Sequence, residues 1–178
     1  MYSIKTMGWF TLFLLLSTAF TSTIELEKKS LLNDQVELKV PKDFGIMSEE
    51  LMKLKYPSGR RPTLVYSNAS GSINLALNHT QSEATQQLLP EFKDYFVQVF
   101  TNLYPSAERK GSGLKTINGK EVGYVEFISP AIDTEIYNLI FFTDLDGRLL
   151  LCTFNCTINN LEEWEPIGKE IFNSLKIK

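Results

Sequence analysis

Two pairs of residues in one short stretch have the types and spacing that could support chemistry. The stretch FFTDLDGRLLLCTFNC, residues 141–156, holds two carboxylates, Asp144 and Asp146, directly before a glycine. It also holds the only two cysteines of the chain, Cys152 and Cys156. A D-x-D-G pattern occurs in calcium loops, and two nearby cysteines can form a disulfide, a redox pair or half of a metal site. The residues around each pair decide between these chemistries.

The calcium interpretation fails on ligand spacing. A helix–loop–helix calcium site needs oxygen ligands at loop positions 1, 3 and 5, glycine at position 6 and glutamate at position 12. If Asp144 and Asp146 occupy positions 3 and 5, then Phe142 falls at position 1 and Thr153 at position 12. Neither supplies the required carboxylate, so the sequence predicts no metal site, and Asp146-Gly147 is expected to form a β-turn.

The cysteines leave several alternatives open. Residues four apart on one extended strand lie about 13 Å from each other, whereas a disulfide needs Cα atoms roughly 4.4–6.8 Å apart. A Cys152–Cys156 disulfide therefore requires a break in the strand near Phe154. Without that break, both are buried small hydrophobic residues, and intermolecular or reactive thiols are a third alternative. The only histidine, His79, cannot complete a tetrahedral metal site with them.

Catalytic patterns are weak in this sequence. His79 is the only imidazole, and the chain has no G-x-S-x-G, P-loop or G-x-G-x-x-G pattern. The sequence therefore favours a non-enzymatic protein without a cofactor. The alternative is a hydrolase that uses carboxylates, and His79, in a pocket between a sheet and a helix.

A basic segment, KLKYPSGRRPTL, stands out in an otherwise acidic chain. Arginine and tyrosine are enriched at protein interfaces, so we expect the segment to bind an anionic partner. An acidic protein, phospholipid headgroups and a polyanionic polymer of the cell envelope all have suitable charge. The alternative is a solvated loop. The predicted partner-binding residues are Lys53, Lys55, Tyr56, Arg60 and Arg61.

Length and charge limit the classes of function. The 178 residues are 43% hydrophobic, which suits one globular domain. The net charge is −3, with 18 basic and 21 acidic residues and no long basic run. Because nucleic-acid binding depends on neutralising phosphates with basic residues, nucleic acid is not an expected partner.

The N-terminus has the pattern of a secretory signal peptide. One positive charge precedes an apolar run over residues 8–16, and small residues Ser17 and Ala19 allow cleavage after residue 19. Cleavage up to residue 23 is a weaker option. The run is shorter than the roughly 20 apolar residues that cross a membrane, so no transmembrane span is expected in the mature chain. We expect a periplasmic or extracellular protein, with an uncleaved N-terminal anchor as the lesser alternative.

Hydrophobic periodicity predicts the following elements of secondary structure. Residues 20–35 are polar and mixed, and we expect them to be poorly ordered. The predicted elements are a strand at 36–40, a short helix after Ser48, a hairpin turning at 68–71, a helix within 82–105, hairpins turning at 118–119 and 146–147, and a helix within 160–178. The apolar stripe of the long helix consists of Leu88, Phe92, Tyr95, Phe96, Val99, Phe100 and Leu103.

Together these elements predict an α+β domain over residues 36–178. Hairpins build an antiparallel sheet, here of about six to seven strands. Residues 139–142 and 149–151 are apolar at consecutive positions, which indicates that both faces of the sheet are covered. One amphipathic helix on each face gives an α/β/α sandwich.

The sequence resembles the PsbP-like fold family, which includes exported bacterial DcrB-like proteins. The resemblance lies in VELKVPKDF at 36–44, in the hairpin INGKEVGYVEF at 117–127 and in IFNSLKI at 171–177. It implies an exported binding or assembly module at the cell envelope, whose partner is another protein or an anionic envelope component. The alternative is a carrier of a small ligand or lipid, which would need a cavity between the long aromatic helix and the sheet.

Overall fold

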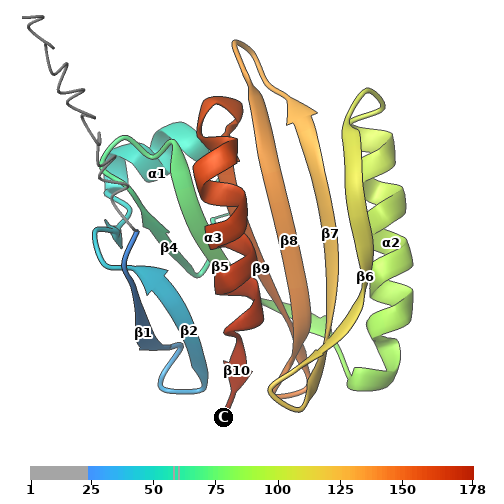
Figure 1. Cartoon of the computed structure of the whole chain (residues 1–178). Coiled ribbons are helices and arrows are strands. Elements are labelled where there is room, and N and C mark those ends of the chain that lie inside the picture. The colour runs from blue at the N-terminus through green and yellow to red at the C-terminus, as the bar shows by residue number, and fades with distance from the viewer. Residues whose placement is uncertain (1–23, 58, 60) are drawn as a thin grey trace, which may run out of the picture.

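A seven-stranded antiparallel sheet lies at the centre of the computed structural model, which describes residues 24–57, 59 and 61–178 (Figure 1). The predicted signal segment, residues 1–19 with cleavage up to 23, lies outside the described residues. The strands of the sheet are, in spatial order, β3 Gly45–Ile46, β4 Leu64–Ser67, β5 Ile73–Glu83, β9 Arg148–Thr157, β8 Glu135–Leu145, β7 Lys120–Pro130 and β6 Glu108–Ile117. This number of strands agrees with the prediction of six to seven.

Tight turns form at the predicted positions. Asn118 and Gly119 join β6 to β7 with φ of 49° and 83°, and Asp146 and Gly147 join β8 to β9 with φ of 50° and 72°. Two successive positive φ angles define the type I′ turn, and Asn-Gly and Asp-Gly are the pairs that adopt it most readily. Gly71, with φ of 69°, closes the turn between β4 and β5.

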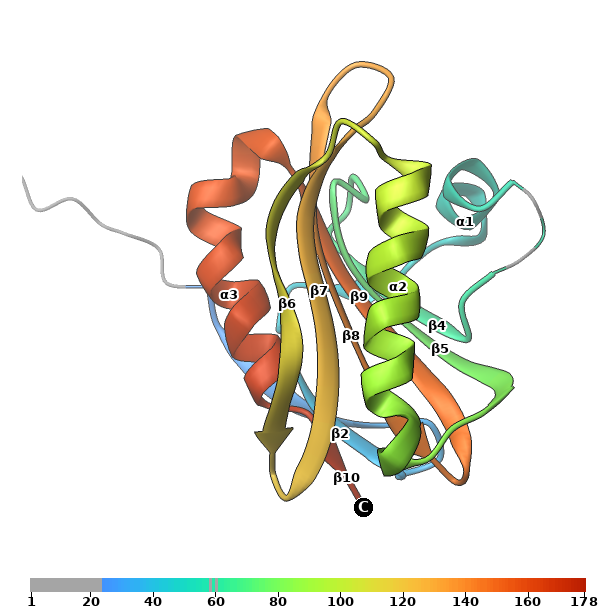
Figure 2. The same cartoon turned by 90° about the vertical axis from the view of Figure 1, so that its right-hand side faces the viewer.

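Helices cover both faces of the sheet, as predicted. The long helix α2, Leu89–Leu103, packs over β6 and β7, and the short helix α1, Glu49–Lys55, lies on the same side. Helix α3, Leu161–Asn173, packs on the opposite face against β8 and β9 (Figure 2). Within the described part of the chain, no helix is long and apolar enough to cross a membrane.

The central strands are buried on both faces because each face has its own helix. Leu139 and Phe141 of β8 belong to the core beneath α3, and Ile140 and Phe142 belong to the core beneath α2. All four side chains are at most 5% exposed. The run of consecutive apolar residues therefore predicted the layering correctly.

A second, three-stranded sheet corrects the prediction for the N-terminal segment. Residues 26–31, which we expected to be poorly ordered, form β1, Leu26–Leu31, and this strand pairs with β2, Val36–Pro41. The short C-terminal strand β10, Lys176–Ile177, pairs with the other side of β2. The polar sequence of β1 hid the strand because β1 is an edge strand, whose exposed positions carry charged residues.

Candidate functional site

The predicted basic segment is partly neutralised by its own helix. Of the five predicted partner-binding residues the structure describes Lys53, Lys55, Tyr56 and Arg61, whereas Arg60 lies outside the described residues. Lys53 and Lys55 are exposed at the end of α1. Arg61 Nη1 donates to Glu49 Oε2 at 2.9 Å. Tyr56 is half-buried, and burial raises its pKa. The structure thus places the described basic residues at or near α1, and one of them, Arg61, is neutralised by Glu49 of the same helix.

Both cysteines are free thiols inside the core beneath α3. Cys152 and Cys156 lie on the same face of β9, whose pairing with β8 continues without a break from one to the other. The strand break that a disulfide between them requires is therefore missing, and this bond is not formed. Burial raises the pKa of both thiols, that of Cys156 to about 12.

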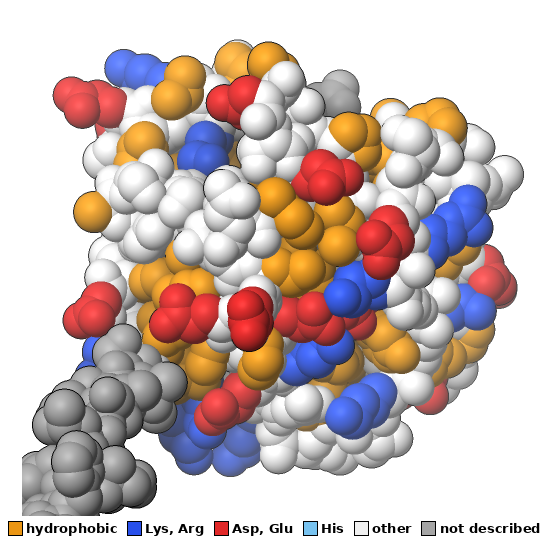
Figure 3. All heavy atoms as spheres, turned by 45° about the horizontal axis from the view of Figure 1, so that its top comes forward, with side chains coloured by type: hydrophobic (Ala, Val, Ile, Leu, Met, Phe, Trp, Pro, Cys, Tyr) orange, Lys and Arg blue, Asp and Glu red, His pale blue; other side chains and the backbone are white. Residues whose placement is uncertain are grey.

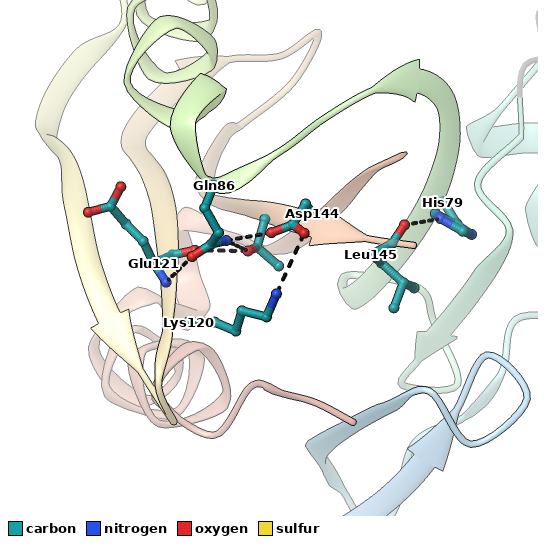
Figure 4. A network of polar contacts seen from close by, with 7 residues as sticks. His79, Gln86, Lys120, Glu121, Asp144 and Leu145 are labelled. Carbon is teal, nitrogen blue, oxygen red and sulfur yellow. Dashed lines mark hydrogen bonds and ion pairs between the residues drawn. The ribbon is translucent and has the colours of Figure 1, made fainter. Parts of the chain in front are cut away.

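The two carboxylates of the D-x-D-G stretch bind different partners. Asp144 accepts a hydrogen bond from Gln86 and lies 3.5 Å from Lys120 Nζ (Figure 4). Asp146 accepts a hydrogen bond from Gln35. No group of three or more metal-ligating side chains occurs among the residues that the structure describes. These contacts are structural, since each one joins separate segments of the chain.

Gln86 and His79 are likewise engaged with backbone groups (Figure 4). Gln86 Oε1 accepts the Glu121 N–H at 2.8 Å, and Gln86 Nε2 donates to Thr143 Oγ1 at 3.2 Å. This side chain ties the 3-10 turn Gln86–Leu88, directly before α2, to β7 and β8. His79 Nε2 donates to the Leu145 carbonyl at 3.0 Å. His79 therefore acts as a link between β5 and the end of β8.

An apolar cavity lies between the C-terminal half of α2 and strands β6 and β7, with a volume of about 220 Å³. We call it the α2–β6 pocket. Its apolar wall is formed mainly by Val97, Phe100, Thr101, Tyr104, Val125 and Phe127, and Arg109 and Ser112 of β6 complete it on the sheet side. A cavity of about 150 Å³ lined by Leu, Ile and Phe holds a benzene ring. The α2–β6 pocket is therefore large enough for one aromatic or branched side chain.

Aromatic stacking shapes this pocket. The Phe100 and Phe127 rings stack with centroids 5.0 Å apart, and Tyr104 lies 5.9 Å from Phe127. The hydroxyl of Thr101 donates to the Val97 carbonyl at 2.6 Å. Because that hydroxyl is satisfied within α2, Thr101 adds mainly its methyl group to the wall.

A β-bulge lies at the pocket end of β6. The register of β6 on β7 shifts between Arg109 and Gly111, which places one extra residue, Lys110, in the edge strand. Such a bulge bends its strand and increases the local twist. Arg109 lies opposite Phe127 in the register and lines the pocket.

On the other face of the sheet, a charged network joins α3 to β6, β7 and β8. Lys169 Nζ lies 3.2 Å from the buried Glu126 carboxylate and 2.6 Å from Glu165, which also binds Lys110 at 2.8 Å. The Tyr137 hydroxyl donates to Glu126 at 2.9 Å. Burial, reinforced by the Glu126 charge, raises the pKa of Tyr137. Burial opposes ionisation of Glu165, yet hydrogen bonds from both lysines outweigh it and lower the Glu165 pKa. The network fastens α3 to the sheet.

Another exposed apolar surface lies at the end of the molecule drawn at the top of Figure 1. Ile132, in the loop between β7 and β8, is fully exposed, and Leu103 at the end of α2 is 63% exposed. Figure 3 shows both acidic and basic side chains beside hydrophobic ones across this end.

The sequence located only part of this site. Phe100 belongs to the predicted apolar stripe and forms a pocket wall, but Tyr95 and Leu103 of the same stripe are 57% and 63% exposed. Helix α2 packs over β6 and β7 and reaches Phe142 of β8 through Phe96, but Tyr95 and Leu103 remain exposed to solvent. Tyr104, Arg109 and the bulge were missed. Tyr104, the aromatic residue directly after the predicted stripe, was the one feature of the sequence that could have indicated the pocket.

The arrangement of the sheet and its covering helices is that of a PsbP-like fold, as the sequence predicted. Cyanobacterial PsbP (CyanoP) from Synechocystis sp. PCC 6803 is 14% identical, with a TM-score of 0.62 over 92% of this chain and 99% of that chain. At this level of identity, the similarity shows the fold alone.

Two other solved structures share the fold at lower similarity. The Ran-binding protein Mog1p of Saccharomyces cerevisiae is 12% identical, with a TM-score of 0.51 over 87% of this chain and 96% of that chain. LpqN, described as involved in cell envelope biogenesis of Mycobacterium tuberculosis, is 11% identical, with a TM-score of 0.52 over 80% and 83%. No family model matches the chain, and no curated protein matches it.

Proposed function

We propose that this protein is an exported, non-enzymatic binding module that holds a partner protein through the α2–β6 pocket. The observation that carries the proposal is the apolar, aromatic-lined cavity of about 220 Å³ beside an edge strand. The known roles of two similar folds agree with it, since Mog1p is Ran-binding and LpqN is involved in cell envelope biogenesis. The signal pattern of residues 1–19 supports the proposed export, and we propose that the module acts at the cell envelope.

The size of the pocket favours a protein partner over a lipid or other small ligand. Sites for small molecules usually measure about 300–1,000 Å³ and enclose most of the ligand. A cavity of 220 Å³ is too small for an acyl chain with its headgroup, but it suits one apolar side chain that anchors a protein interface. The pocket therefore supports the binding module better than the carrier.

The position of the titratable groups favours binding over hydrolysis. The groups with the most strongly raised pKa values are Tyr137, Cys152 and Cys156, and none of them lines the pocket. His79 donates to a backbone carbonyl away from the pocket lining. An active site would need several such groups directed into one cavity.

Site-specific photo-crosslinking in the native envelope tests the proposal. A photoreactive phenylalanine analogue at Tyr104, in the pocket, is expected to give one defined adduct, identified by mass spectrometry. The same analogue at Tyr95, which is 57% exposed and outside the pocket lining, serves as the matched control. Thr101→Trp fills the pocket and should abolish the adduct, whereas Asn102→Trp, on the exposed side of α2, should preserve it. Equal adducts from both positions would refute the proposal.

The basic segment near α1 is a second proposed contact, for an anionic partner of the kind expected from the sequence. It is favoured by the exposure of Lys53, Lys55 and Arg61. We predict that the double substitution Arg60→Glu/Arg61→Glu abolishes a salt-sensitive interaction in pull-downs from envelope extracts, because surface electrostatic contacts are screened by salt. The midpoint of thermal unfolding should change little, because the Arg61–Glu49 ion pair that is lost lies at the surface. If the double variant captured the same partner as the unsubstituted chain, the proposed contact through the basic segment would be wrong.

A further inference from the structure

Strand β6 is a long, unpaired sheet edge. It has ten residues, whereas β3 at the opposite edge has two. Within residues 24–57, 59 and 61–178, β6 pairs with β7 on one side and with no strand on the other, and it borders the sheet beside α2 (Figure 1). The outward N–H and C=O groups of such an edge are a template for another strand.

The α2–β6 pocket adjoins this edge. Arg109 and Ser112 of β6 form its wall on the sheet side. An extended chain that paired with the outer side of β6 would run past the pocket opening. Successive side chains of a strand point to opposite faces, so every second side chain of the added segment would lie on the face that holds the pocket.

Three of the four charged residues of β6 are basic (Arg109, Lys110 and Lys115, with Glu108 as the one acid), and the basic residues are not fully compensated. Lys110 pairs with Glu165, but among the described residues neither Arg109 nor Lys115 has a carboxylate partner. Lys115 Nζ instead donates to the neutral Asn173 Oδ1 at 2.7 Å. Lys115 lies opposite Val122 in the register and on the α3 face, whereas Arg109 lies on the pocket face. Both faces of an added strand would therefore meet positive charge.

We infer that β6 accepts an extended segment of the partner protein as an additional strand, in which apolar side chains alternate with acidic ones. One apolar side chain enters the α2–β6 pocket, and acidic side chains on the other face approach Lys115. The inference rests on the proposed function, because it specifies the partner chemistry of the same pocket. Main-chain hydrogen bonds give affinity in this mode of recognition, and the side-chain pocket gives specificity.

A second copy of this chain fits the edge less well. If two β6 strands paired antiparallel over all ten residues, Lys110 of each would lie opposite Lys115 of the other. Like charges directly opposite each other destabilise a strand pair. Lysines and bulges on an edge generally discourage pairing between copies, but the same lysines attract an acidic segment.

A labelled peptide tests the inference on the full chain by fluorescence anisotropy. The probe is Val-Asp-Val-Asp-Phe-Asp-Val, blocked at both ends. Two variants carry N-methyl groups either on all aspartate amides or on all apolar-residue amides. In strand addition only one of these sets of N–H groups faces β6. One variant is therefore expected to lose affinity by roughly tenfold or more, because three or four N–H donors to β6 are blocked, and the other to retain it.

Three controls tie binding to the pocket and to charge. Thr101→Trp should abolish binding of the unmethylated probe, whereas Asn102→Trp should preserve it. A probe with lysine in place of every aspartate should lose affinity by about tenfold or more. Circular dichroism of the two variants confirms that both fold.

The outcomes separate the failure of this inference from that of the proposed function. Equal affinity of the two methylated probes would overturn strand addition while leaving the pocket as a side-chain site. Absence of probe binding, with a specific crosslink still formed at Tyr104, would overturn the acidic strand and retain the binding module. Dimerisation through β6, seen as concentration-dependent sedimentation, would assign the edge to a second copy. If the probe does not bind and the Tyr104 analogue also gives no specific crosslink, both strand addition and the proposed binding module are refuted.

Discussion

Gly168 permits close contact between α3 and the sheet, because a Cβ at this position would lie 2.5 Å from Cδ1 of the fully buried Phe154. Alanine in a helix is favoured over glycine by about 1 kcal/mol, but overpacking a rigid core costs about 1–3 kcal/mol. Because Phe154 cannot move aside, we predict that Gly168→Ala lowers the free energy of unfolding by about 1–2 kcal/mol, measured by urea denaturation. Gly45→Ala, where a Cβ would meet nothing within 4 Å, is the matched control and should change it little.

Cys152 and Cys156 are expected to resist thiol reagents in the folded protein. Burial keeps both thiols protonated, with the pKa of Cys156 raised to about 12, whereas unfolded cysteine ionises near ~8.5. The folded state thus binds more protons above pH ~8.5, so this contribution to stability is full below that pH and is lost as pH rises. Ellman's reagent at pH 8 should label neither thiol in buffer and both in urea. Labelling of fewer than two thiols in urea without reductant would instead reveal a disulfide.

Lys169 has a larger structural role than a surface lysine, because it compensates the charge of Glu126, a residue only 7% exposed. Breaking a fully buried ion pair costs about 3–5 kcal/mol. The Lys169 side chain is 44% exposed, so we predict a smaller loss of about 1–2 kcal/mol for Lys169→Met. Adding Glu126→Gln should recover part of this loss, since no uncompensated charge then remains. A double-mutant cycle measured by urea denaturation gives the coupling free energy between Lys169 and Glu126. If the two substitutions change the free energy of unfolding additively, the predicted role of Lys169 is wrong.

The sequence predicted those elements whose signals are local. Asn118-Gly119 and Asp146-Gly147 form the turns that their φ preferences require, and the consecutive apolar residues of β8 indicated a layer on each face. The prediction failed for β1, because an exposed edge strand needs few apolar residues and gains its stability from pairing with β2. Propensity and periodicity do not report such pairing between strands.

The candidate site was harder to predict because it depends on where separate elements meet. Tyr104 is an ordinary residue after a helix until α2 packs over β7 and brings its ring within 5.9 Å of Phe127. The bulge at Lys110 is likewise a property of strand pairing. Conversely, the basic residues near α1 were found easily as a cluster, but the sequence did not show that Arg61 binds Glu49. Local patterns therefore located the elements better than the surfaces between them.

In the part of the chain that the structure describes, the seven-stranded sheet has one long open edge, β6, whose lysines should help to keep the protein from self-associating. In a fully paired antiparallel dimer through β6, Lys110 would face Lys115. We predict that Lys110→Val/Lys115→Val promotes concentration-dependent dimers or aggregates, because an apolar edge strand pairs readily with its copies. Analytical ultracentrifugation measures the change. Lys53→Val/Lys55→Val makes the same substitutions on α1, away from the edge, and should leave the sedimentation coefficient unchanged. Equal association of both variants would show that added hydrophobicity, and not the β6 edge, drives it.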